Sequence, residues 1–422
     1  MKNIDYKKSI PVKGSYDVIV CGGGVAGVAA AITAAENGFS TLLIEKSNIL
    51  GGLGTLGLIN YFVPMCNGRG KQIIFGLAEK WLRASAELGI NNIPKEWRDG
   101  EPKTYTEVKY IQRYSPAIFA YYLTEQVKLS GAEVLFDCMA VDPIMDGNVV
   151  KGVITESKGG TEFYACKVVI DSTGDCDLLR RAGIPTVKGS NYYTFGTKLV
   201  TLESCKKAVE KQNIKYIYKT MDGGGVNLFG DGQPEDVPRW SGLSAEEVTD
   251  YIVRNHLELL EKLKKVDRKT REIVSTPGMP QFRTTAHIKG DYSLKVTDVY
   301  KHFEDSVCAI NNFEACDHLF EVPLRTLCRK DYPNVLAAGR CADGTGFGWD
   351  ILRVIPPAIL TGQASAEAAC LSIEMGVGVA QVDIPTLQKR LEAKNVMIHF
   401  PDEYVPEDRR IIIHGIDMTN GG

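Results

Sequence analysis

Three glycines, Gly22, Gly24 and Gly27, follow the apolar run YDVIVC at residues 16–21 with the spacing G-x-G-x-x-G. The next stretch, VAAAITAAENG, has helical composition and stops at Gly38. In a strand, turn and helix of this kind, the first glycine permits the turn and the second lets backbone N–H groups approach a pyrophosphate. The third allows the helix to pack closely on the strand. The chemistry that these residues predict is the binding of a dinucleotide.

An acidic residue lies where a dinucleotide site needs one. A second strand, expected at 40–44, ends at Glu45, at the distance from the glycines where a carboxylate accepts hydrogen bonds from a ribose diol. An acid at this position argues against a 2′-phosphate, which requires an arginine. The glycine spacing alone is a weak signal, and Glu45 as a solvated charge at a strand end stays open as an alternative.

The glycines at 51, 52 and 54 in LIEKSNILGGLGT decide between nicotinamide and flavin dinucleotides. With the first motif, they resemble the FAD-dependent oxidoreductases that have a bipartite nucleotide-binding domain, relatives of fumarate-reductase-type and heterodisulfide-reductase-type flavoproteins. In that family a glycine-rich turn passes beside the pyrophosphate and the ribityl chain. A nicotinamide enzyme has no use for such a turn, so the resemblance implies FAD.

Three further segments, at 131–154, 167–183 and 334–369, match the same family in order. The first would bring the backbone near Ala140 to the adenine. The second has an A-T-G-like turn in which Ser172 replaces the usual alanine. The cofactor-binding residues that the resemblance implies are Gly22, Gly24, Val25, Ala26, Gly27, Glu45, Lys46, Gly51, Gly52, Gly54, Thr55, Ala140, Thr173, Gly174, Asp175, Gly339, Arg340, Arg353 and Ile355.

The segment at 334–369 suggests how the flavin is tuned. Pro356 and Pro357 are expected to pre-set the first turn of a helix after an open loop that contains glycines at 344, 346 and 348. A helix N-terminus aimed at the pyrimidine edge of a flavin stabilises the negative charge that builds up there on reduction. Arg353 would add a full positive charge. The alternatives are a glycine-rich surface connection and a salt-bridged arginine.

The elements around these motifs predict an α/β fold, a Rossmann-like FAD-binding domain with an interleaved α+β cap or substrate domain. Two helices are expected in the cap, GLAEKWLRASAELG with Trp81 and Leu82 in the core, and a long amphipathic helix begun by Ser244. A short helix, PTLQKRLEAK, and the β-prone RRIIIHGI are expected in the tail. The predicted boundaries are 14–59, 116–185 and 321–376 for the FAD-binding domain, 60–115 and 186–320 for the cap, and 377–422 for the C-terminal tail.

Arg283 and His287 are the candidate substrate residues, and with Arg353 they complete the predicted catalytic set. They fall in a cap segment that resembles one the family places near the cofactor, although Ala286 stands where the family often has a second arginine. An arginine clamps an anion and a histidine exchanges a proton, so both are expected to face the open side of the flavin ring. The alternative is an ion-paired arginine and a hydrogen-bonded structural histidine.

Composition excludes several function classes for the 422-residue chain. A net charge of -3 and a pI near 6.2 provide no basic surface for nucleic acid. No signal peptide or membrane-spanning run is recognised, so a cytoplasmic protein without a membrane partner is expected. The 11 cysteines form no C-x-x-C pair, and no metal site is expected. No histidine precedes His256, so the FAD is expected to be non-covalent, although Cys66 could in principle form a thioether.

The leading hypothesis is an FAD-dependent oxidoreductase that moves a hydride or electron pair between the flavin and a small organic substrate. Two alternatives stay open: a flavin electron-transfer subunit that relays electrons to a protein partner, and a flavin oxidase or monooxygenase. Cysteine clusters typical of electron-transfer subunits are absent from the sequence. A homo-oligomer or an electron-accepting protein partner is compatible with the sequence.

Overall fold

A seven-stranded sheet forms the centre of the molecule. The computed structural model describes residues 4, 7–91, 93, 112–315 and 317–420. Strands β5, β2, β1, β8 and β16 run parallel, and β7 and β6 continue the sheet antiparallel from β8. The strands are β5 (Glu133–Leu135), β2 (Thr41–Ile44), β1 (Val12–Cys21), β8 (Gly160–Asp171), β16 (Val335–Ala337), β7 (Val149–Ser157) and β6 (Met139–Asp146).

The sheet is buried on both faces because β1 is apolar at successive positions. Val18 and Val20 belong to the core beneath the helices, whereas Ile19 and Cys21 point into a second core on the opposite face. Near-continuous apolar runs of this kind are typical of parallel strands that are covered on both sides. The predicted α/β, Rossmann-like architecture is therefore confirmed.

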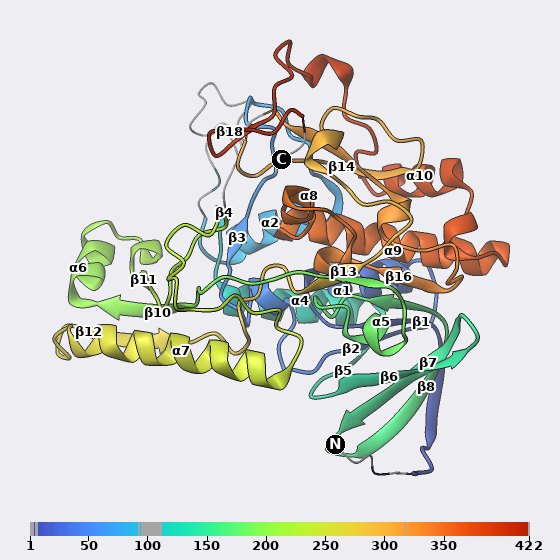
Figure 1. The fold of residues 1–422 in the computed structure, drawn as a ribbon, viewed down its shortest axis with the longest axis horizontal. Coiled ribbons are helices and arrows are strands. Elements are labelled where there is room, and N and C mark those ends of the chain that lie inside the picture. Colours follow the sequence, from blue (N-terminus) through green and yellow to red (C-terminus); the bar gives the residue numbers. More distant parts are fainter. Residues whose placement is uncertain (1–3, 5–6, 92, 94–111, 316, 421–422) are drawn as a thin grey trace.

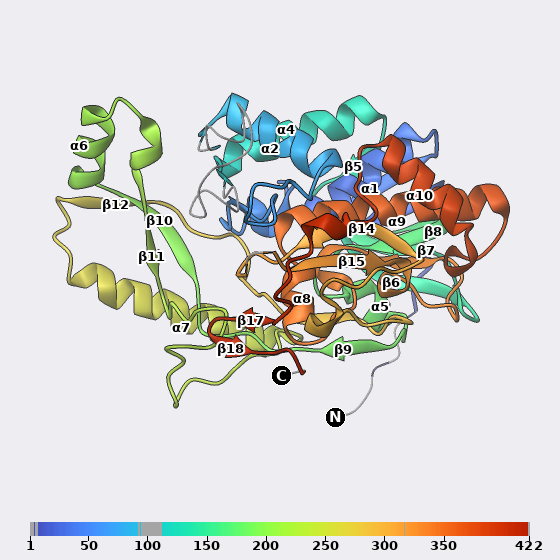
Figure 2. The same cartoon turned by 90° about the horizontal axis from the view of Figure 1, so that it is seen from above.

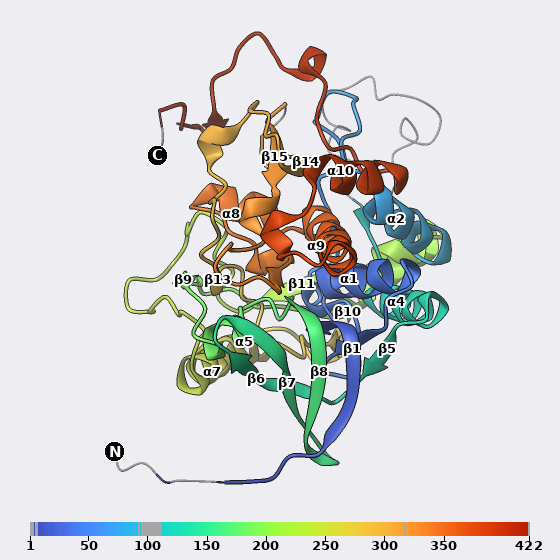
Figure 3. The ribbon, with the colours of Figure 1, turned by 90° about the vertical axis from the view of Figure 1, so that its right-hand side faces the viewer.

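Helices cover one face of the sheet, as Figure 3 shows. An added Cβ on Gly362 would lie 2.1 Å from the carbonyl oxygen of Ala26, so glycine at this position allows α1 and α9 to pack closely. Trp81 and Leu82 of α2 are fully buried, which confirms their predicted place in the core. The layer contains α1 (Val25–Glu36), α9 (Ile355–Met375), α4 (Pro116–Ser130) and α2 (Gly76–Leu88), and α10 (Ile384–Ala393) packs on α9.

Four parallel strands end at the same edge of the sheet. Cys21 at the end of β1 is in register with Ile44 of β2 and with Asp171 of β8, and Asp171 is in register with Ala337 of β16. The loops that follow these strands therefore meet, as ligand-binding loops do at the carboxyl edge of open α/β sheets. All four loops carry residues predicted to bind the cofactor.

A second unit projects from this body as an arm (Figures 1 and 2). It is a three-stranded antiparallel sheet in the order β11, β10, β12, with two helices. The long helix begins where predicted, with Ser244 Oγ accepting a hydrogen bond of 3.2 Å from the Glu247 amide. The elements are β10 (Gly196–Thr201), β11 (Tyr218–Asp222), β12 (Arg271–Ser275), α6 (Leu202–Glu210) and α7 (Ala245–Lys264).

Three antiparallel pairs of short strands and two short helices lie in the connections between these elements. The prediction of an open loop around the glycines at 344, 346 and 348 is partly wrong, because helix α8 begins directly after Gly346 and contains Gly348. The boundary predicted after residue 320 falls inside β15, which pairs with β14. These elements are β3 (Tyr61–Phe62) with β4 (Gln112–Arg113), β9 (Thr186–Lys188) with β13 (Ala286–Ile288), β14 (Ser306–Asn311) with β15 (Leu319–Pro323), α5 (Asp177–Arg181) and α8 (Phe347–Leu352).

The tail holds the expected short helix, α10, and then a small hairpin of β17 (Ile412–Ile413) and β18 (Ile416–Asp417). The ten cysteines that the structure describes are all free thiols. Within the described ranges, no helix has both the length and the apolar character needed to cross a bilayer.

Candidate active site

The first glycine turn has room for no other residue at two of its positions. Gly22 has φ +98°, and an added Cβ would lie 2.6 Å from the carbonyl oxygen of Ser172. A Cβ on Gly27 would lie only 1.9 Å from the carbonyl oxygen of Gly22. Glycine at position 27 therefore allows α1 to pack directly against the turn.

The second glycine turn packs on the first. The amide of Gly51 donates a hydrogen bond of 2.8 Å to the carbonyl of Gly23, and a Cβ on Gly52 would lie 3.1 Å from Gly24 Cα. Both Gly51 and Gly52 have positive φ, +103° and +54°. The extra glycines that distinguish the flavin motif thus bring a second backbone segment against the pyrophosphate turn.

Gly24 differs from its neighbours because an added Cβ would meet no atom within 4 Å. The open space above it faces the N-terminus of α1, where Val28 N–H is bonded to Gly24 O at 2.9 Å. The three amides before Val28 have no acceptor within the helix, and the first turn contains no acidic residue. A phosphate fits this position, because helix N-termini offer N–H donors and a positive dipole end.

The cavity above these turns, here the cofactor cavity, has a volume of about 480 Å³. It reaches from the end of β2 to the start of α9. Sequence reasoning missed several of its wall residues, among them Leu56, Cys138, Gly278 and Met279. The predicted residues that line it are Gly22, Gly24, Val25, Ala26, Glu45, Lys46, Gly51, Gly52, Gly54, Ala140, Thr173, Gly174, Gly339, Arg340, Arg353 and Ile355.

Glu45 lies in the wall of the cofactor cavity and is nearly buried. Its Oε2 accepts from the Gly23 amide at 2.6 Å, and its Oε1 accepts from the Ser47 amide at 2.8 Å. Each carboxylate oxygen keeps a further lone pair, so the fixed carboxylate can still accept from a ribose hydroxyl. The reading of Glu45 as a solvated charge is wrong, because only 8% of the residue is exposed.

Three residues predicted to bind the cofactor support the cavity instead of lining it. Gly27 packs against the first turn, as described above. The Thr55 hydroxyl donates to the carbonyl of Leu50 at 2.6 Å, and Asp175 pairs with Arg340 Nη2 at 2.7 Å. The side chains of Thr55 and Asp175 are engaged within the protein, whereas the amide of Gly27 is one of the three at the start of α1. Contact of these three residues with the cofactor stays a prediction.

Arg340 ties two loops together at the wall of the cofactor cavity. Besides the pair with Asp175, its Nε donates to the carbonyl of Gly174 at 2.6 Å, and its Nη1 donates to the carbonyl of Phe282. The guanidinium of Arg340 is therefore engaged by hydrogen bonds within the protein.

The buried carboxylate of Asp171 accepts hydrogen bonds from the amides of Thr173 and Leu179. Burial outweighs these hydrogen bonds and raises the pKa of Asp171 to about 6.

Arg353 lines the far end of the cofactor cavity, beside the first residues of α9. Its guanidinium forms an ion pair of 2.6 Å with Asp350, which agrees with the salt-bridged alternative raised from the sequence. Asp350 also faces a second cavity, which holds Arg283. Burial, and then the positive charge of Arg353, lower the pKa of Arg283.

Arg283 and His287 line this second cavity, here the hairpin cavity, of about 720 Å³ beside β9 and β13. None of its described wall residues also lines the cofactor cavity. The two residues therefore lie in a different cavity from most of the predicted cofactor-binding residues, and their contact with the flavin stays a prediction. The reason for the separation is local: Asn191 Oδ1 accepts from the Arg283 amide at 2.7 Å, and the Arg353–Asp350 pair lies between the two cavities.

His287 has the surroundings of a structural histidine. It is 3% exposed, and its Nδ1 lies 2.7 Å from the carbonyl oxygen of Ile288 and 3.2 Å from Asp343 Oδ1. Its ring packs edge to face on Trp349, with centroids 4.4 Å apart. The Nη1 of Arg283, in contrast, is buried without a hydrogen-bond partner among the described residues.

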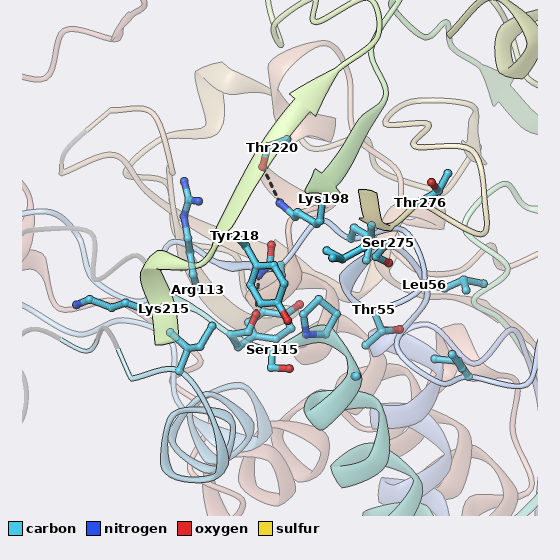
Figure 4. Close-up of a pocket in the computed structure, with 18 of the residues that line it drawn as sticks. Thr55, Leu56, Arg113, Ser115, Lys198, Lys215, Tyr218, Thr220, Ser275 and Thr276 are labelled. Atoms are coloured by element: carbon cyan, nitrogen blue, oxygen red, sulfur yellow. Dashed lines mark hydrogen bonds between the residues drawn. The ribbon is translucent and has the colours of Figure 1, made fainter. Parts of the chain in front are cut away.

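A third cavity, here the cap cavity, adjoins the cofactor cavity and was not predicted. It has a volume of about 460 Å³ and lies where the arm meets the helices, and Leu56 lines both cavities (Figure 4). Its walls carry three cations, Arg113, Lys198 and Lys215, and no carboxylate among the described residues. The remaining described wall residues are aliphatic, aromatic or neutral polar side chains.

Lys198 projects into the cap cavity from β10, and its Nζ donates to Thr220 Oγ1 at 2.9 Å (Figure 4). Burial, and then the charge of Arg113, lower the pKa of Lys198, with Asp222 acting in the opposite direction. No carboxylate forms an ion pair with Lys198 in the described ranges. An anion in this cavity would therefore gain a desolvated positive partner.

The profile of the FAD dependent oxidoreductase family matches residues 17–240 and 210–391. The chain belongs to this family. Its cofactor is therefore FAD, and it is an enzyme of the oxidoreductase class. The residues around Gly24 fit the pyrophosphate of this cofactor, because open space there meets amides at a helix N-terminus that have no acceptor within the helix.

Curated relatives match the chain over part of its length. It is 31% identical over 182 residues to a digeranylgeranylglycerophospholipid reductase of Methanoculleus marisnigri, covering 42% of this chain and 43% of that protein. A reductase of the same name from Methanocella arvoryzae is 33% identical over 190 residues, with 42% and 43% covered. The chain thus spans less than half the length of these relatives.

Solved structures match more than 90% of the chain at low identity. A geranylgeranyl bacteriochlorophyll reductase-like protein from Thermoplasma acidophilum is 15% identical, with 93% of this chain and 94% of that chain covered and a TM-score of 0.39. L-proline dehydrogenase from P. horikoshii is 14% identical, with 92% and 100% covered and a TM-score of 0.40.

Proposed function

We propose that this FAD-dependent oxidoreductase transfers a hydride between non-covalently bound FAD and a small, partly apolar organic anion held in the cap cavity. The observation that carries the proposal is the composition of this cavity, which combines three cations with apolar walls and shares Leu56 with the cofactor cavity. A volume of about 460 Å³ falls within the range of small-molecule sites.

In this proposal the cofactor cavity would supply a partner for each part of FAD. Glu45 would accept from the ribose hydroxyls, and the amides at the N-terminus of α1 would donate to the pyrophosphate. The backbone near Ala140 would meet the adenine, which leaves Arg353 and the start of α9 for the flavin. When bound, FAD supplies the two-electron chemistry, and the protein supplies orientation and electrostatics.

The walls of the cofactor cavity support non-covalent binding. The described wall residues include no histidine, and their only cysteine, Cys138, lies beside Ala140 at the proposed adenine end. Cys66, the residue considered for a thioether, is fully buried and does not belong to the described wall. Flavin released intact on denaturation is the expected result.

The cations of the cap cavity would hold the acidic group of the substrate while its apolar part contacts Leu56 and Leu58. Lys198 is best placed for this contact because it is partly desolvated and hydrogen-bonded only to a hydroxyl in the described structure. The curated relatives are named as reductases of a phospholipid, which supports a substrate that combines an anionic group with apolar chains.

The test is a redox screen on the purified holoprotein under anaerobic conditions. Carboxylates and phosphate monoesters with saturated or unsaturated apolar chains are added, and the flavin absorbance reports reduction of the oxidised protein or reoxidation of the reduced protein. A responding anion supports the proposal, and Lys198→Met should then raise its apparent KM about 10–100-fold, as for a lost charged hydrogen bond. Lys206→Met, on the exposed face of α6, is the matched control.

Other outcomes point to different functions. Rapid reoxidation by oxygen with peroxide release would identify an oxidase, and reoxidation only by a protein acceptor would identify an electron-transfer subunit. An anionic substrate whose KM rises in Arg283→Lys while Lys198→Met leaves it unchanged would move the substrate to the hairpin cavity and restore the roles first predicted for Arg283 and His287.

A further inference from the structure

A buried carboxylate outside all three cavities collects two histidines. Glu321 of β15 is 0% exposed, and its Oε1 lies 2.5 Å from His302 Nδ1 and 3.0 Å from His399 Nδ1. His302 precedes β14, whereas His399 follows α10 in the tail. The two sides of the β14–β15 hairpin and the C-terminal tail therefore direct ligand-type atoms at one point.

The second nitrogen of His302 restricts what can lie between these groups. His302 Nε2 is 3.1 Å from Asp402 Oδ1, and a carboxylate only accepts, so this nitrogen carries a proton. Without an ion, a doubly protonated ring also donates to Glu321 Oε1 through Nδ1. A metal ion can take the place of this Nδ1 proton, because the Nδ1 lone pair of a neutral ring and the lone pairs of Glu321 Oε1 face the same point.

The spacing fits a metal ion after small side-chain movements. The ligand atoms of His302, Glu321 and His399 all lie within 4.8 Å of one another. Zinc bound tetrahedrally at about 2.0–2.2 Å places neighbouring ligand atoms about 3.3–3.6 Å apart. The carboxylate is anchored, because Glu321 Oε2 accepts from the Phe303 amide at 2.7 Å.

Access and support around the cluster also suit a metal. The side chains of His302 and His399 are 41% and 44% exposed, so an ion can enter from solvent and a water can complete the coordination. Asp402 would hold His302 by its outer N–H, as carboxylates commonly do for histidine ligands of zinc. Two imidazoles and one carboxylate are a donor set typical of divalent transition metals.

We propose that His302, Glu321 and His399 bind one divalent transition-metal ion, of which Zn²⁺ is the type. The ion would join the C-terminal tail to the β14–β15 hairpin, where Ser306 Oγ already donates to the carbonyl of Ile398 at 2.7 Å. This site is independent of the redox proposal, because none of the three ligands lines the cofactor, cap or hairpin cavity.

The test is metal binding by the full-length, FAD-loaded protein after chelator treatment and removal of the chelator. Zn²⁺ titration by calorimetry should show one equivalent per chain, and His302→Ala and His399→Ala should each weaken binding at least about 100-fold. His256→Ala, at an exposed position of α7, should bind like the wild type. No stoichiometric binding by the wild type, or unchanged binding by both histidine variants, would overturn the proposal.

Two further readouts separate the site from adventitious binding and from misfolding. Co²⁺ should give the visible spectrum of nitrogen and oxygen ligation, and a thiolate-to-cobalt band would assign the metal to cysteines instead. Asp402→Asn should weaken Zn²⁺ binding about 10–100-fold without abolishing it. Flavin absorbance and circular dichroism of the variants should match the wild type because both histidines are near the surface, and Zn²⁺ should raise the Tm only when the ligands are present.

Discussion

The cofactor cavity and the cap cavity adjoin at Leu56 but are built in different ways. The cofactor cavity consists largely of backbone at the carboxyl ends of parallel strands, with glycines at positions such as 22 and 51 where a side chain would collide. The cap cavity consists of side chains, contributed by the segment after the second glycine turn, by α4 and by the arm (Figure 4).

This difference predicts how well each cavity should tolerate substitutions. A site built from backbone depends on glycines, so a substitution there causes a steric clash and an abrupt loss of binding or stability. A site built from side chains depends on charge and shape, so a substitution there should weaken binding by degrees and differently for each ligand. The variants below test this contrast.

The largest effect is expected at Gly27. A Cβ there would lie 1.9 Å from the carbonyl oxygen of Gly22 and 2.4 Å from Ser172 Oγ, so Gly27→Ala must displace the turn or the helix. The free energy of unfolding should fall by about 3 kcal/mol, at the upper end of overpacking effects, and FAD should be lost. Chemical denaturation and the flavin content of the purified protein measure both.

Gly24→Ala is the matched comparison for Gly27→Ala. Gly24 has φ -65°, which alanine adopts freely, and its added Cβ meets no protein atom within 4 Å. The free energy of unfolding of the apoprotein should stay within about 0.5 kcal/mol of the wild type. FAD affinity should still fall by about 1–3 kcal/mol, because the methyl group would crowd the pyrophosphate. Equal losses of stability in the two variants would contradict the contrast.

The contrast also explains which features were visible in the sequence. Gly22, Gly24 and Gly27 are determined by local sterics, and Glu45 by its distance along one strand–turn–helix–strand unit, so local patterns predict them. Gly51 and Gly52 pack against these glycines and lie in the loop that follows β2 and Glu45. The cofactor cavity was therefore largely predictable.

Features assembled from distant segments were not predictable from the sequence. Arg113, Lys198 and Lys215 line one cavity only because the arm packs on the helices, and no spacing rule connects them. His302, Glu321 and His399 likewise meet across strand β15 and the tail, so the expectation of no metal site rested on cysteine spacing alone. Arg283 and His287 were placed by resemblance, but the Arg353–Asp350 pair separates them from the cofactor cavity.

Lys198 should give the substrate site a pH dependence. Its lowered pKa means that the ammonium loses its proton at a lower pH than an ordinary lysine. Affinity for an anionic substrate should therefore fall as the pH rises through this pKa, and Lys198→Arg should keep its affinity to higher pH. The measurement is the pH profile of KM for the anion found in the screen. Matching profiles for the two proteins would contradict the assignment of Lys198.

A smaller effect is expected at Glu45. Glu45→Gln keeps the shape of the side chain but leaves only one oxygen for the Gly23 amide, the Ser47 amide and the ribose. FAD affinity should fall by about 1–2 kcal/mol, the range for one lost hydrogen bond in a buried setting. Calorimetric titration of the apoprotein with FAD measures this change. Unchanged affinity in a variant that folds normally would remove Glu45 from the FAD-binding site.

The smallest effect is expected at the flavin end of the cofactor cavity, where Arg353 lies beside the N-terminus of α9. A positive charge there favours the negative charge that the flavin gains on reduction, so Arg353→Met should lower the midpoint potential. The ion pair with Asp350 already offsets part of that charge, so the shift should be modest, about 10–30 mV, or roughly 0.5–1.4 kcal/mol for two electrons.

Asp350→Asn sharpens the same test because it acts in the opposite direction. Removing the carboxylate leaves the guanidinium of Arg353 uncompensated, so the midpoint potential should rise. Potentiometric titration of both variants at full FAD occupancy gives the two shifts. Shifts of opposite sign would place the Arg353–Asp350 pair beside the flavin, whereas two unchanged potentials would leave the pair as a wall between the cofactor and hairpin cavities with no part in tuning the cofactor.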